Sequence, residues 1–309
     1  MRSLGVNAVF PIALGGASWS FSDDHDVEER AIKTIHTAIA SGVTLIDTAR
    51  AYSRVAHPGH SEALIARALA HHPARDRILV ATKGGHYRDG DQFPIDAKPD
   101  TIRRHCETSL ELLGVDRIDL YQLHWPDPNL SMRKAIATFG ELQSEGLIAA
   151  IGVCNVSIAQ LEEARSVVPI VSVQNSFSPF RQDDRLMLDY CAERSIAYLS
   201  YSPLGGPETR HLAARFPGSA AVAASKGISL ARLALAWLLR CSPVLIPISG
   251  AGRPETIYDS ARAPDVALSE EEVAALDFDL PSRGPRTPGR SFSSRGDSIA
   301  VAREIGGKA

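Results

Sequence analysis

The 309-residue sequence lacks the markers of several common protein classes. It has no apolar run as long as a membrane-spanning helix requires. Its N-terminal residues make a poor signal peptide, because they lack a basic start and a cleavage site. The net charge of -3 supplies no field that would attract nucleic acid or an anionic membrane. We therefore expect a cytoplasmic globular protein that binds neither nucleic acid nor a membrane.

Cysteine is scarce, and Cys106, Cys154, Cys191 and Cys241 form no CxxC pair. A chain of this length buries enough apolar surface to fold without disulfides, so we expect reduced cysteines. None of the ten histidines belongs to an HExxH pattern. No structural or catalytic metal site is therefore predicted.

Short apolar runs alternate with longer amphipathic stretches along most of the chain. The expected strands are 12–14, 43–46, 78–81, 119–123, 150–153, 171–173, 197–200 and 244–247. The expected helices are 28–41, 61–70, 100–113, 131–145, 158–166, 183–194 and 229–240. Nearly continuous apolar strands separated by helices are typical of a parallel sheet that helices cover. Eight such units in this length predict an α/β fold, a (β/α)8 TIM barrel forming a single domain over residues 1–309.

A doubly wound open sheet is the competing architecture. It would contain fewer strands and a glycine-rich turn after the first of them. Gly15 and Gly16 do follow the first expected strand, but no GxGxxG fingerprint opens a helix there. The missing fingerprint favours the barrel over the open sheet.

The C-terminal segment, residues 280–309, departs from the strand–helix alternation. The stretch LPSRGPRTPGRSFSSRGDS is rich in Pro, Gly, Ser and Arg. Such a composition predicts a long loop and tail. The segment is either a lid over one face of the barrel or a solvated basic tail.

Polar residues directly follow several expected strands, at the end where barrels carry their active sites. Asp47 follows the second strand with Tyr52 five residues later, Lys83 follows the third and His124 the fourth. A tyrosine pKa of about 10 is too high for acid–base work at neutral pH, and a nearby lysine ammonium lowers it. A carboxylate keeps the lysine charged, and a histidine can hydrogen-bond to a substrate oxygen. The set predicts proton donation by Tyr52 to a carbonyl that is being reduced.

A carbonyl reduction also requires a hydride source, which a cofactor supplies. Asn155 and Gln174 follow adjacent expected strands and could hold a nicotinamide carboxamide. Tyr201, at the end of the next strand, could stack on the nicotinamide ring. The alternative for Asn155 and Gln174 is ordinary hydrogen bonding at a strand end.

At this point the sequence resembles the aldo-keto reductase superfamily over nearly its whole length. The resemblance rests on six motifs in order: GVTLIDTARAY, ILVATKGG, DLYQLHWPD, IGVCNVS, VSVQNSFSP and LSYSPLGG. It implies a catalytic tetrad of Asp47, Tyr52, Lys83 and His124 with the tyrosine as general acid. It also implies an extended cofactor held without a Rossmann fold, so the absence of GxGxxG is expected.

The resemblance also assigns the cofactor-binding residues. They are Cys154, Asn155, Gln174, Tyr201, Ser202, Leu204 and Gly205, and Gly250, Arg253, Thr256 and Ser260 in LIPISGAGRPETIYDS. Arg253 would face the 2′-phosphate or the adenine. Cys154 replaces a usual serine, Gly252 stands where many NADPH-preferring members have a lysine, and Ser260 replaces a frequent asparagine. Because Arg253 still supplies one cation, NADPH is the expected cofactor, with NADH as the alternative.

The substrate pocket is predicted from aromatic residues near the strand ends. Trp19, Tyr87 and Trp125 are candidate wall residues, and each has loop packing as its alternative. The expected partner is a small-molecule aldehyde or ketone, and no feature demands an oligomer.

Two other functions stay open for this sequence. A barrel lyase, aldolase or isomerase could use Lys83 as a Schiff base, but it would leave Tyr52 and the Asn155–Gln174 pair unexplained. A cofactor-sensing subunit, like the channel-associated β-subunits of the same superfamily, could carry an intact tetrad.

Overall fold

The computed structural model describes residues 1–21 and 26–278. Its barrel strands are β3 (Ala13–Gly15), β4 (Leu45–Asp47), β5 (Leu79–Gly84), β6 (Leu120–Leu123), β7 (Ile151–Cys154), β8 (Ser172–Ser176), β9 (Ala197–Tyr201) and β10 (Leu245–Ser249). They close in chain order, and β10 pairs with β3 to complete the ring. All neighbouring pairs are parallel. The predicted (β/α)8 barrel is confirmed.

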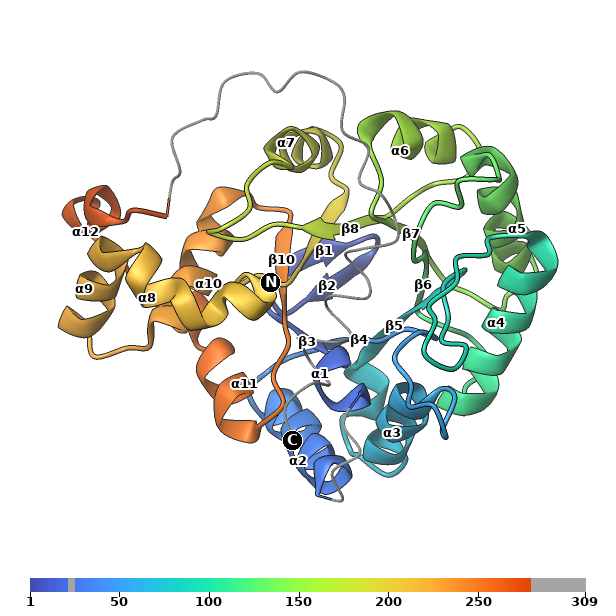
Figure 1. Ribbon diagram of the computed structural model, residues 1–309, viewed down its shortest axis with the longest axis horizontal. Coiled ribbons are helices and arrows are strands. Elements are labelled where there is room, and N and C mark those ends of the chain that lie inside the picture. The colour runs from blue at the N-terminus through green and yellow to red at the C-terminus, as the bar shows by residue number, and fades with distance from the viewer. Residues whose placement is uncertain (22–25, 279–309) are drawn as a thin grey trace.

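Helices surround the ring of strands on its outer side (Figure 1). They are α2 (Val27–Ala40), α3 (His60–Leu69), α4 (Pro99–Leu113), α5 (Met132–Ser144), α6 (Ile158–Arg165), α7 (Arg185–Glu193) and α10 (Leu230–Cys241). Each lies within about two residues of its predicted range. Gly114 ends α4 with a left-handed φ of 64°, a conformation that glycine adopts readily at a helix C-terminus.

The N-terminal end of the barrel is closed by a hairpin that the periodicity did not predict. The hairpin pairs β1 (Arg2–Leu4) with β2 (Asn7–Val9). Leu4 and Val9 pack against inward-facing strand residues that include Leu45, Ala81 and Leu120. This apolar plug fills one half of the barrel interior, so polar chemistry is left to the opposite end.

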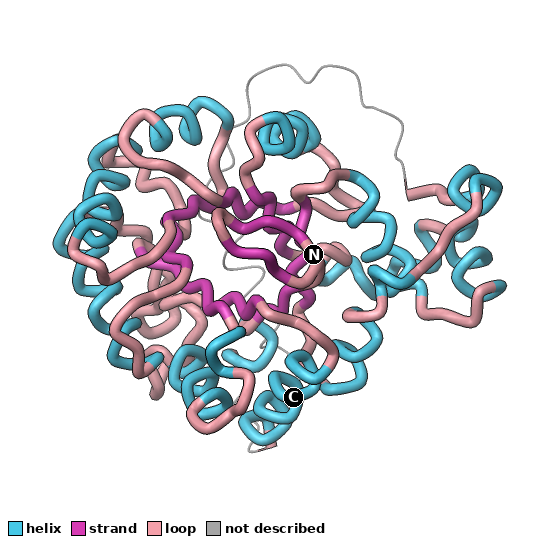
Figure 2. Tube along the Cα trace, turned by 180° about the vertical axis from the view of Figure 1, so that it is seen from behind, coloured by secondary structure: helices cyan, strands magenta, loops and turns pink. Residues whose placement is uncertain are grey.

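Several short elements also lie outside the predicted pattern. They are α1 (Ala17–Ser20), η1 (Arg75–Arg77), η2 (Gly206–His211), α8 (Leu212–Arg215), α9 (Pro217–Ser225), α11 (Pro254–Ser260), η3 (Ala263–Asp265) and α12 (Glu270–Ala275). Both views show α8, α9 and α12 beside the helix ring rather than within it (Figures 1 and 2). Asp277 ties this group together, because its carboxylate accepts hydrogen bonds from the backbone N–H groups of Gly218 and Ser219.

The predicted C-terminal lid or tail, residues 280–309, falls outside the described residues. The single-domain organisation over 1–309 therefore stays a prediction. Among the described helices, none is by itself long and apolar enough to cross a membrane. One bent pair, α9 with α10, meets that test by length and composition only.

Candidate active site

Side chains two residues apart on a strand face the same way, and this alternation separates the barrel interior into two layers. Asp47 comes two residues after Leu45, and Lys83 comes two residues after Ala81. The plug residues form the lower layer, so their partners form an upper layer toward the C-terminal strand ends. Its members are Asp47, Lys83, Gln122, Cys154 and Gln174, all at most 2% exposed.

An ion pair lies at the centre of this upper layer. Lys83 Nζ donates to Asp47 Oδ2 at 2.7 Å and to the Thr48 carbonyl oxygen at 2.8 Å. Burial alone would lower the pKa of Lys83, but the adjacent Asp47 carboxylate outweighs it, and the pKa lies above its ordinary value. Lys83 is therefore an ammonium with a fixed position.

Two glutamines complete the shell around the Asp47 carboxylate. Gln174 Nε2 donates to Oδ1 at 2.8 Å, and Gln122 Nε2 approaches the same oxygen at 3.4 Å. Cys154 Sγ in turn donates to Gln122 Oε1 at 3.8 Å. Gln122 was missed by the sequence reading. Its position one residue before Leu123, inside an apparently apolar strand, was the available signal.

The loop that carries Tyr52 is anchored by buried polar contacts on both sides. Arg50 and Glu62 form an ion pair at 2.9 Å, and the Glu62 side chain is fully buried. Thr82 Oγ1 donates to the other Glu62 oxygen at 2.7 Å, which links the loop to β5. The Tyr52 carbonyl oxygen accepts the Ser61 N–H at the start of α3. These contacts fix the height of Tyr52 above the barrel.

Tyr52 lies over the lysine, with Lys83 Nζ 5.1 Å from the centre of the tyrosine ring. Desolvation raises the pKa of Tyr52, and the attraction of Lys83 opposes this shift without reversing it. The expectation of a lowered tyrosine pKa was wrong in its sign, because it counted the lysine charge and not the burial. The phenol is held in its protonated form, as a proton donor requires.

His124 follows β6 and meets Tyr52 edge to face, with ring centres 5.9 Å apart and an interplanar angle of 84°. Its backbone N–H donates to the Gly84 carbonyl oxygen at 3.0 Å. Burial holds the pKa of His124 well below its usual range, and His86 and Lys83 lower it further. A neutral imidazole offers one N–H donor, which suits an oxygen that is gaining charge.

Asn155 and Tyr201 bridge this centre to the later strands. Asn155 Nδ2 donates to the His124 carbonyl oxygen at 2.9 Å, and its Oδ1 accepts the Tyr201 hydroxyl at 2.9 Å. The Asn155 backbone is left-handed, with φ 58°, a conformation that asparagine tolerates better than most residues. The structure thus brings Asn155, Tyr201 and His124 together, as the sequence predicts.

The remaining predicted cofactor residues lie along β9, β10 and α11. Ser202 and Gly205 have left-handed φ values of 47° and 91°, and the Gly205 N–H donates to the Ser202 carbonyl oxygen at 2.8 Å, which closes a tight turn after β9. An added Cβ at Gly250 would meet nothing within 4 Å, and Arg253 beyond it is exposed at the N-terminus of α11. This open, cationic segment fits the adenosine end of a dinucleotide.

Ser260 and Ser18 both lie near this proposed adenosine-binding segment, but their hydroxyl groups differ in availability. The Ser260 hydroxyl accepts a hydrogen bond from Ser249 at 3.0 Å, and both residues are buried. Ser18, which the sequence reading missed, has a buried hydroxyl without a hydrogen-bond partner among the described residues. It faces the Cβ position of Gly252 at 3.9 Å. Ser18 is thus better placed than Ser260 to offer a hydroxyl to a ligand beside Gly252.

The family model for the Aldo/keto reductase family matches residues 11–278. The chain belongs to the aldo/keto reductase family. It is accordingly an oxidoreductase.

Individual relatives agree with this membership of the aldo/keto reductases. An uncharacterized oxidoreductase of Schizosaccharomyces pombe is 33% identical over 259 residues, 82% of this chain and 80% of the relative. The 6-dehydroglucose reductase of Novosphingobium aromaticivorans is 31% identical over 301 residues, 93% of this chain and 97% of the relative. The aldo-keto reductase of Klebsiella pneumoniae, solved with NADPH, superposes with a TM-score of 0.77 at 27% identity, covering 90% and 94% of the two chains.

The predicted wall of the substrate pocket needs revision in this reductase. Trp19 is 1% exposed and packs within the main core, which matches its loop-packing alternative. Tyr87 turns away toward α4, where its ring meets His105 at 5.1 Å. Trp125 does lie near the site, 6.5 Å from His86 between ring centres. The ring neighbours of Tyr52 and His124 are instead residues that the sequence reading did not single out: Phe21 and His86.

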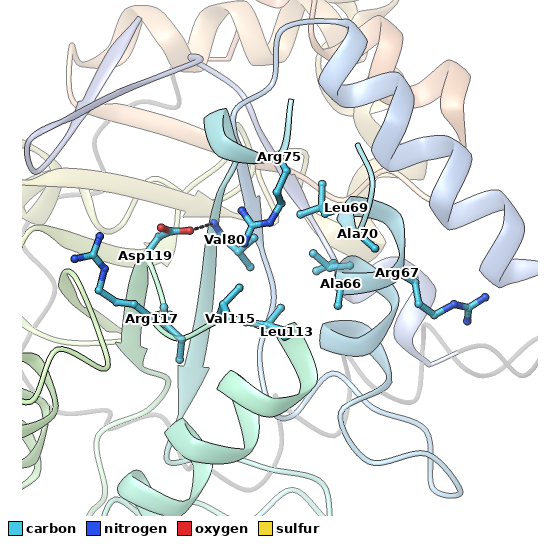
Figure 3. Close-up of a pocket in the computed structure, with 13 residues that line it drawn as sticks. Ala66, Arg67, Leu69, Ala70, Arg75, Val80, Leu113, Val115, Arg117 and Asp119 are labelled. Carbon is cyan, nitrogen blue, oxygen red and sulfur yellow. Dashed lines mark hydrogen bonds between the residues drawn. The ribbon is translucent and has the colours of Figure 1, made fainter. Parts of the chain in front are cut away.

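A separate pocket of about 550 Å³ lies away from this centre, between α3, α4 and the starts of β5 and β6 (Figure 3). Arg75, Arg117 and Asp119 line it together with apolar side chains. Asp119 accepts the Val80 N–H at 2.9 Å, which joins the two strands at that end. Because catalytic groups of barrel enzymes gather at the opposite strand ends, this hollow belongs to the stabilising face of the reductase. No group of three or more metal-ligating side chains occurs in the part of the chain that the structure describes.

Proposed function

We propose that this aldo/keto reductase reduces an aldehyde or ketone to the alcohol with NADPH, and that Tyr52 supplies the proton. One observation carries the proposal. A buried Lys83–Asp47 ion pair lies beneath a protonated Tyr52, and a neutral His124 contacts the same ring. This arrangement combines an acid, a fixed positive charge and an oxygen-facing donor, which carbonyl reduction needs together.

The proton half of the reaction follows from these side chains. His124 donates its imidazole N–H to the carbonyl oxygen and orients the substrate against Tyr52. The Tyr52 hydroxyl then donates its proton to that oxygen as negative charge develops on it. The Lys83 ammonium, held by Asp47, stabilises the phenolate that remains until solvent returns the proton. Lys83 and Asp47 therefore lower the cost of proton donation without exchanging a proton themselves.

The hydride half belongs to the cofactor. When bound, a reduced nicotinamide supplies a hydride to the carbonyl carbon. Asn155 and Gln174 would hold its carboxamide, and Tyr201 would contact the ring from β9. Ser202, Leu204 and Gly205 would hold the pyrophosphate, and Arg253 the 2′-phosphate. The similar reductase of Klebsiella pneumoniae, solved with NADPH, supports this choice of cofactor.

The substrate is a small carbonyl compound. The similarity to a 6-dehydroglucose reductase and, at 32% identity, to the pyridoxine 4-dehydrogenase of Escherichia coli supports an oxygenated substrate rather than a plain hydrocarbon carbonyl. These names belong to the relatives, which are 31% identical to this chain over 301 residues and 32% identical over 255 residues.

The Schiff-base alternative is disfavoured by the state of Lys83. An amine must lose its proton before it can attack a carbonyl. The Asp47 carboxylate holds the pKa of Lys83 above its ordinary value, and two hydrogen bonds occupy its ammonium group. Borohydride trapping of a substrate on Lys83 would revive this alternative.

Steady-state oxidation of NADPH in the presence of an aldehyde and ketone panel tests the proposal. We expect turnover with at least one hydroxylated aldehyde and no turnover without a carbonyl. Tight NADPH binding with no turnover on any member would instead support the cofactor-sensing alternative. The same titration with NADH measures the cofactor preference.

A further inference from the structure

Five aromatic side chains form a closed cycle of ring contacts at the active site. Phe21 meets Tyr52 at 6.1 Å and Phe93 at 6.2 Å between ring centres. Tyr52 meets His124 at 5.9 Å, His124 meets His86 at 4.9 Å, and His86 stacks on Phe93 at 5.9 Å. Within the described residues, no ring contact crosses this cycle. The five side chains come from four separate segments of the chain and form one continuous ring of contacts.

The cycle divides into a reacting side and a binding side. Tyr52 and His124 belong to the proton chemistry described above. Phe21 and Phe93 offer only ring faces and edges. His86 is the remaining member and the only one on the binding side with hydrogen-bonding nitrogens. Any polar group that the substrate directs toward that side must find His86 or stay unpaired.

The hydrogen-bonding state of His86 follows from its contacts. The side chain is 4% exposed, and Nδ1 has no hydrogen-bond partner among the described residues. The Pro94 backbone beside the ring acts to raise the His86 pKa, and a proline backbone can only accept a hydrogen bond. We therefore assign the imidazole proton to Nε2, because Nδ1 is the nitrogen without a partner among the described residues. In a neutral imidazole the other nitrogen then carries a free lone pair.

The neutral form of His86 is maintained by its surroundings. Burial lowers the pKa of His86 to about 4, and the bond to Pro94 opposes this only in part. Nδ1 is therefore a buried hydrogen-bond acceptor in neutral solution. A buried polar atom without a partner is costly, which makes it a strong discriminator once a ligand can satisfy it.

We propose that His86 selects the substrate by accepting a hydrogen bond at Nδ1 from a hydroxyl on the first or second carbon beyond the carbonyl carbon. The substrate class is an α- or β-hydroxy aldehyde or ketone. The inference rests on the proposed function, because it places the carbonyl oxygen between Tyr52 and His124. The 4.9 Å between the perpendicular rings of His86 and His124 suits two oxygens on adjacent or next-adjacent carbons.

The same geometry explains why a plain aldehyde would be a poor substrate. It would bind among the rings but leave Nδ1 of His86 buried and unpaired. Sites built to hydrogen-bond a substrate hydroxyl reject analogues that lack it. Packing alone does not require this nitrogen, since a phenylalanine would stack on Phe93 equally well.

The experiment compares matched substrate pairs that differ by one hydroxyl: 2-hydroxypropanal against propanal, and 3-hydroxybutanal against butanal. The wild-type protein should prefer a hydroxylated member in kcat/KM by about tenfold or more. His86→Phe should reduce that ratio about tenfold, mostly by losing activity on the hydroxylated member. His86→Asn, whose side-chain oxygen can replace the Nδ1 acceptor, should restore part of the preference. His36→Phe, on the outer helix α2, is the matched control and should leave the ratio unchanged.

The outcomes separate this inference from the proposed function. If His86 had a purely structural role, His86→Phe would lower kcat/KM for the hydroxylated and the plain substrate alike. A ratio of the two kcat/KM values unchanged from wild type in His86→Phe would therefore overturn the inference. A wild-type ratio near one for both pairs would overturn it as well, while carbonyl reduction itself would stand. No NADPH oxidation with any member of a broader carbonyl panel would reject the proposed function. Should His86→Phe fail to fold, the His86→Leu and His86→Asn ratios decide the same question.

Discussion

Lys83 Nζ lies 2.7 Å from Asp47 Oδ2, and the two side chains are 0% and 3% exposed. Such a pair is costly to bury, because each ion loses its hydration. It persists here because Gln174 and the Thr48 carbonyl oxygen satisfy further positions on the two ions. The consequence is a fixed positive charge directly below Tyr52, the proposed proton donor.

Tyr52→Phe should retain NADPH binding and lose carbonyl reduction by about 10³-fold, because the ring stays and the donated proton is removed. Fluorescence titration of NADPH measures binding, and NADPH oxidation measures turnover. Tyr190→Phe, on the outer helix α7, is the control with unchanged activity. Near wild-type turnover in Tyr52→Phe would reject the assignment of the proton donor.

Lys83→Met should destabilise the protein by about 3–5 kcal/mol, because it leaves the Asp47 carboxylate buried without its counter-ion. Asp47→Asn should also destabilise it, because the buried lysine ammonium then has no counter-ion. The double variant should be more stable than the sum of the two losses predicts, by about 2 kcal/mol. Urea unfolding measures all three. Additive losses would show that the two groups do not interact energetically.

Arg253→Ala should weaken NADPH binding about tenfold and leave NADH binding nearly unchanged, because one charged contact to the 2′-phosphate is lost. Fluorescence titration gives the dissociation constants of NADPH and NADH, and the variant is compared with wild type for each cofactor. Arg262→Ala, where the side chain instead lies over the Tyr258 ring, is the neighbouring control. Equal losses for both cofactors would exclude a phosphate contact by Arg253.

Stability should fall as the pH falls from about 6.5 toward 4, because three histidines are buried in the neutral form. Burial lowers the pKa of His86 and of His105 to about 4, and holds the pKa of His124 well below its usual range. In this pH interval these histidines bind protons in the unfolded chain but not in the folded chain, so lowering the pH favours unfolding. A shift of the size found for His86 is worth about 3 kcal/mol at its full extent.

Urea unfolding at several pH values measures how the free energy of unfolding changes with pH. In His86→Phe this dependence should be weaker by the equivalent of about one proton, because position 86 no longer titrates in either state. The comparison with wild type also cancels the opposing effect of Asp119 and Asp184, whose pKa values burial raises. An identical slope in both proteins would contradict the neutral assignment of His86.

The barrel, and the position of the proposed tetrad residues at one end of it, were predictable because both depend on local pattern. Asp47, Lys83 and His124 each follow an apolar run, and the barrel topology alone brings such positions to one mouth. Successive side chains on a strand point to opposite faces, which explains why Asp47 and Lys83 face the barrel interior. What the pattern could not supply was the pKa of Tyr52, which depends on burial by several segments at once.

The binding side of the aromatic cycle was not predictable for a similar reason. Phe21 lies far in sequence from His86 and Phe93, and the three residues have no shared spacing. Only the loop conformations bring their rings into contact. Trp19 and Tyr87 are close neighbours in sequence of Phe21 and His86, yet they point into the core and toward α4. A difference of one or two residues, at the end of α1 or in the loop after β5, changes which way a side chain points, and the strand and helix periodicity carries no information there.

The buried thiol of Cys154 has a consequence for how this protein can be handled. Burial raises the pKa of Cys154, and that of Cys106 and Cys191 to about 12. Thiolates are the form that peroxides and alkylating reagents attack, so these three sulfurs should be inert in neutral buffer. A maleimide dye should therefore label the more accessible Cys241 and leave Cys154, beside the Lys83–Asp47 pair, unmodified.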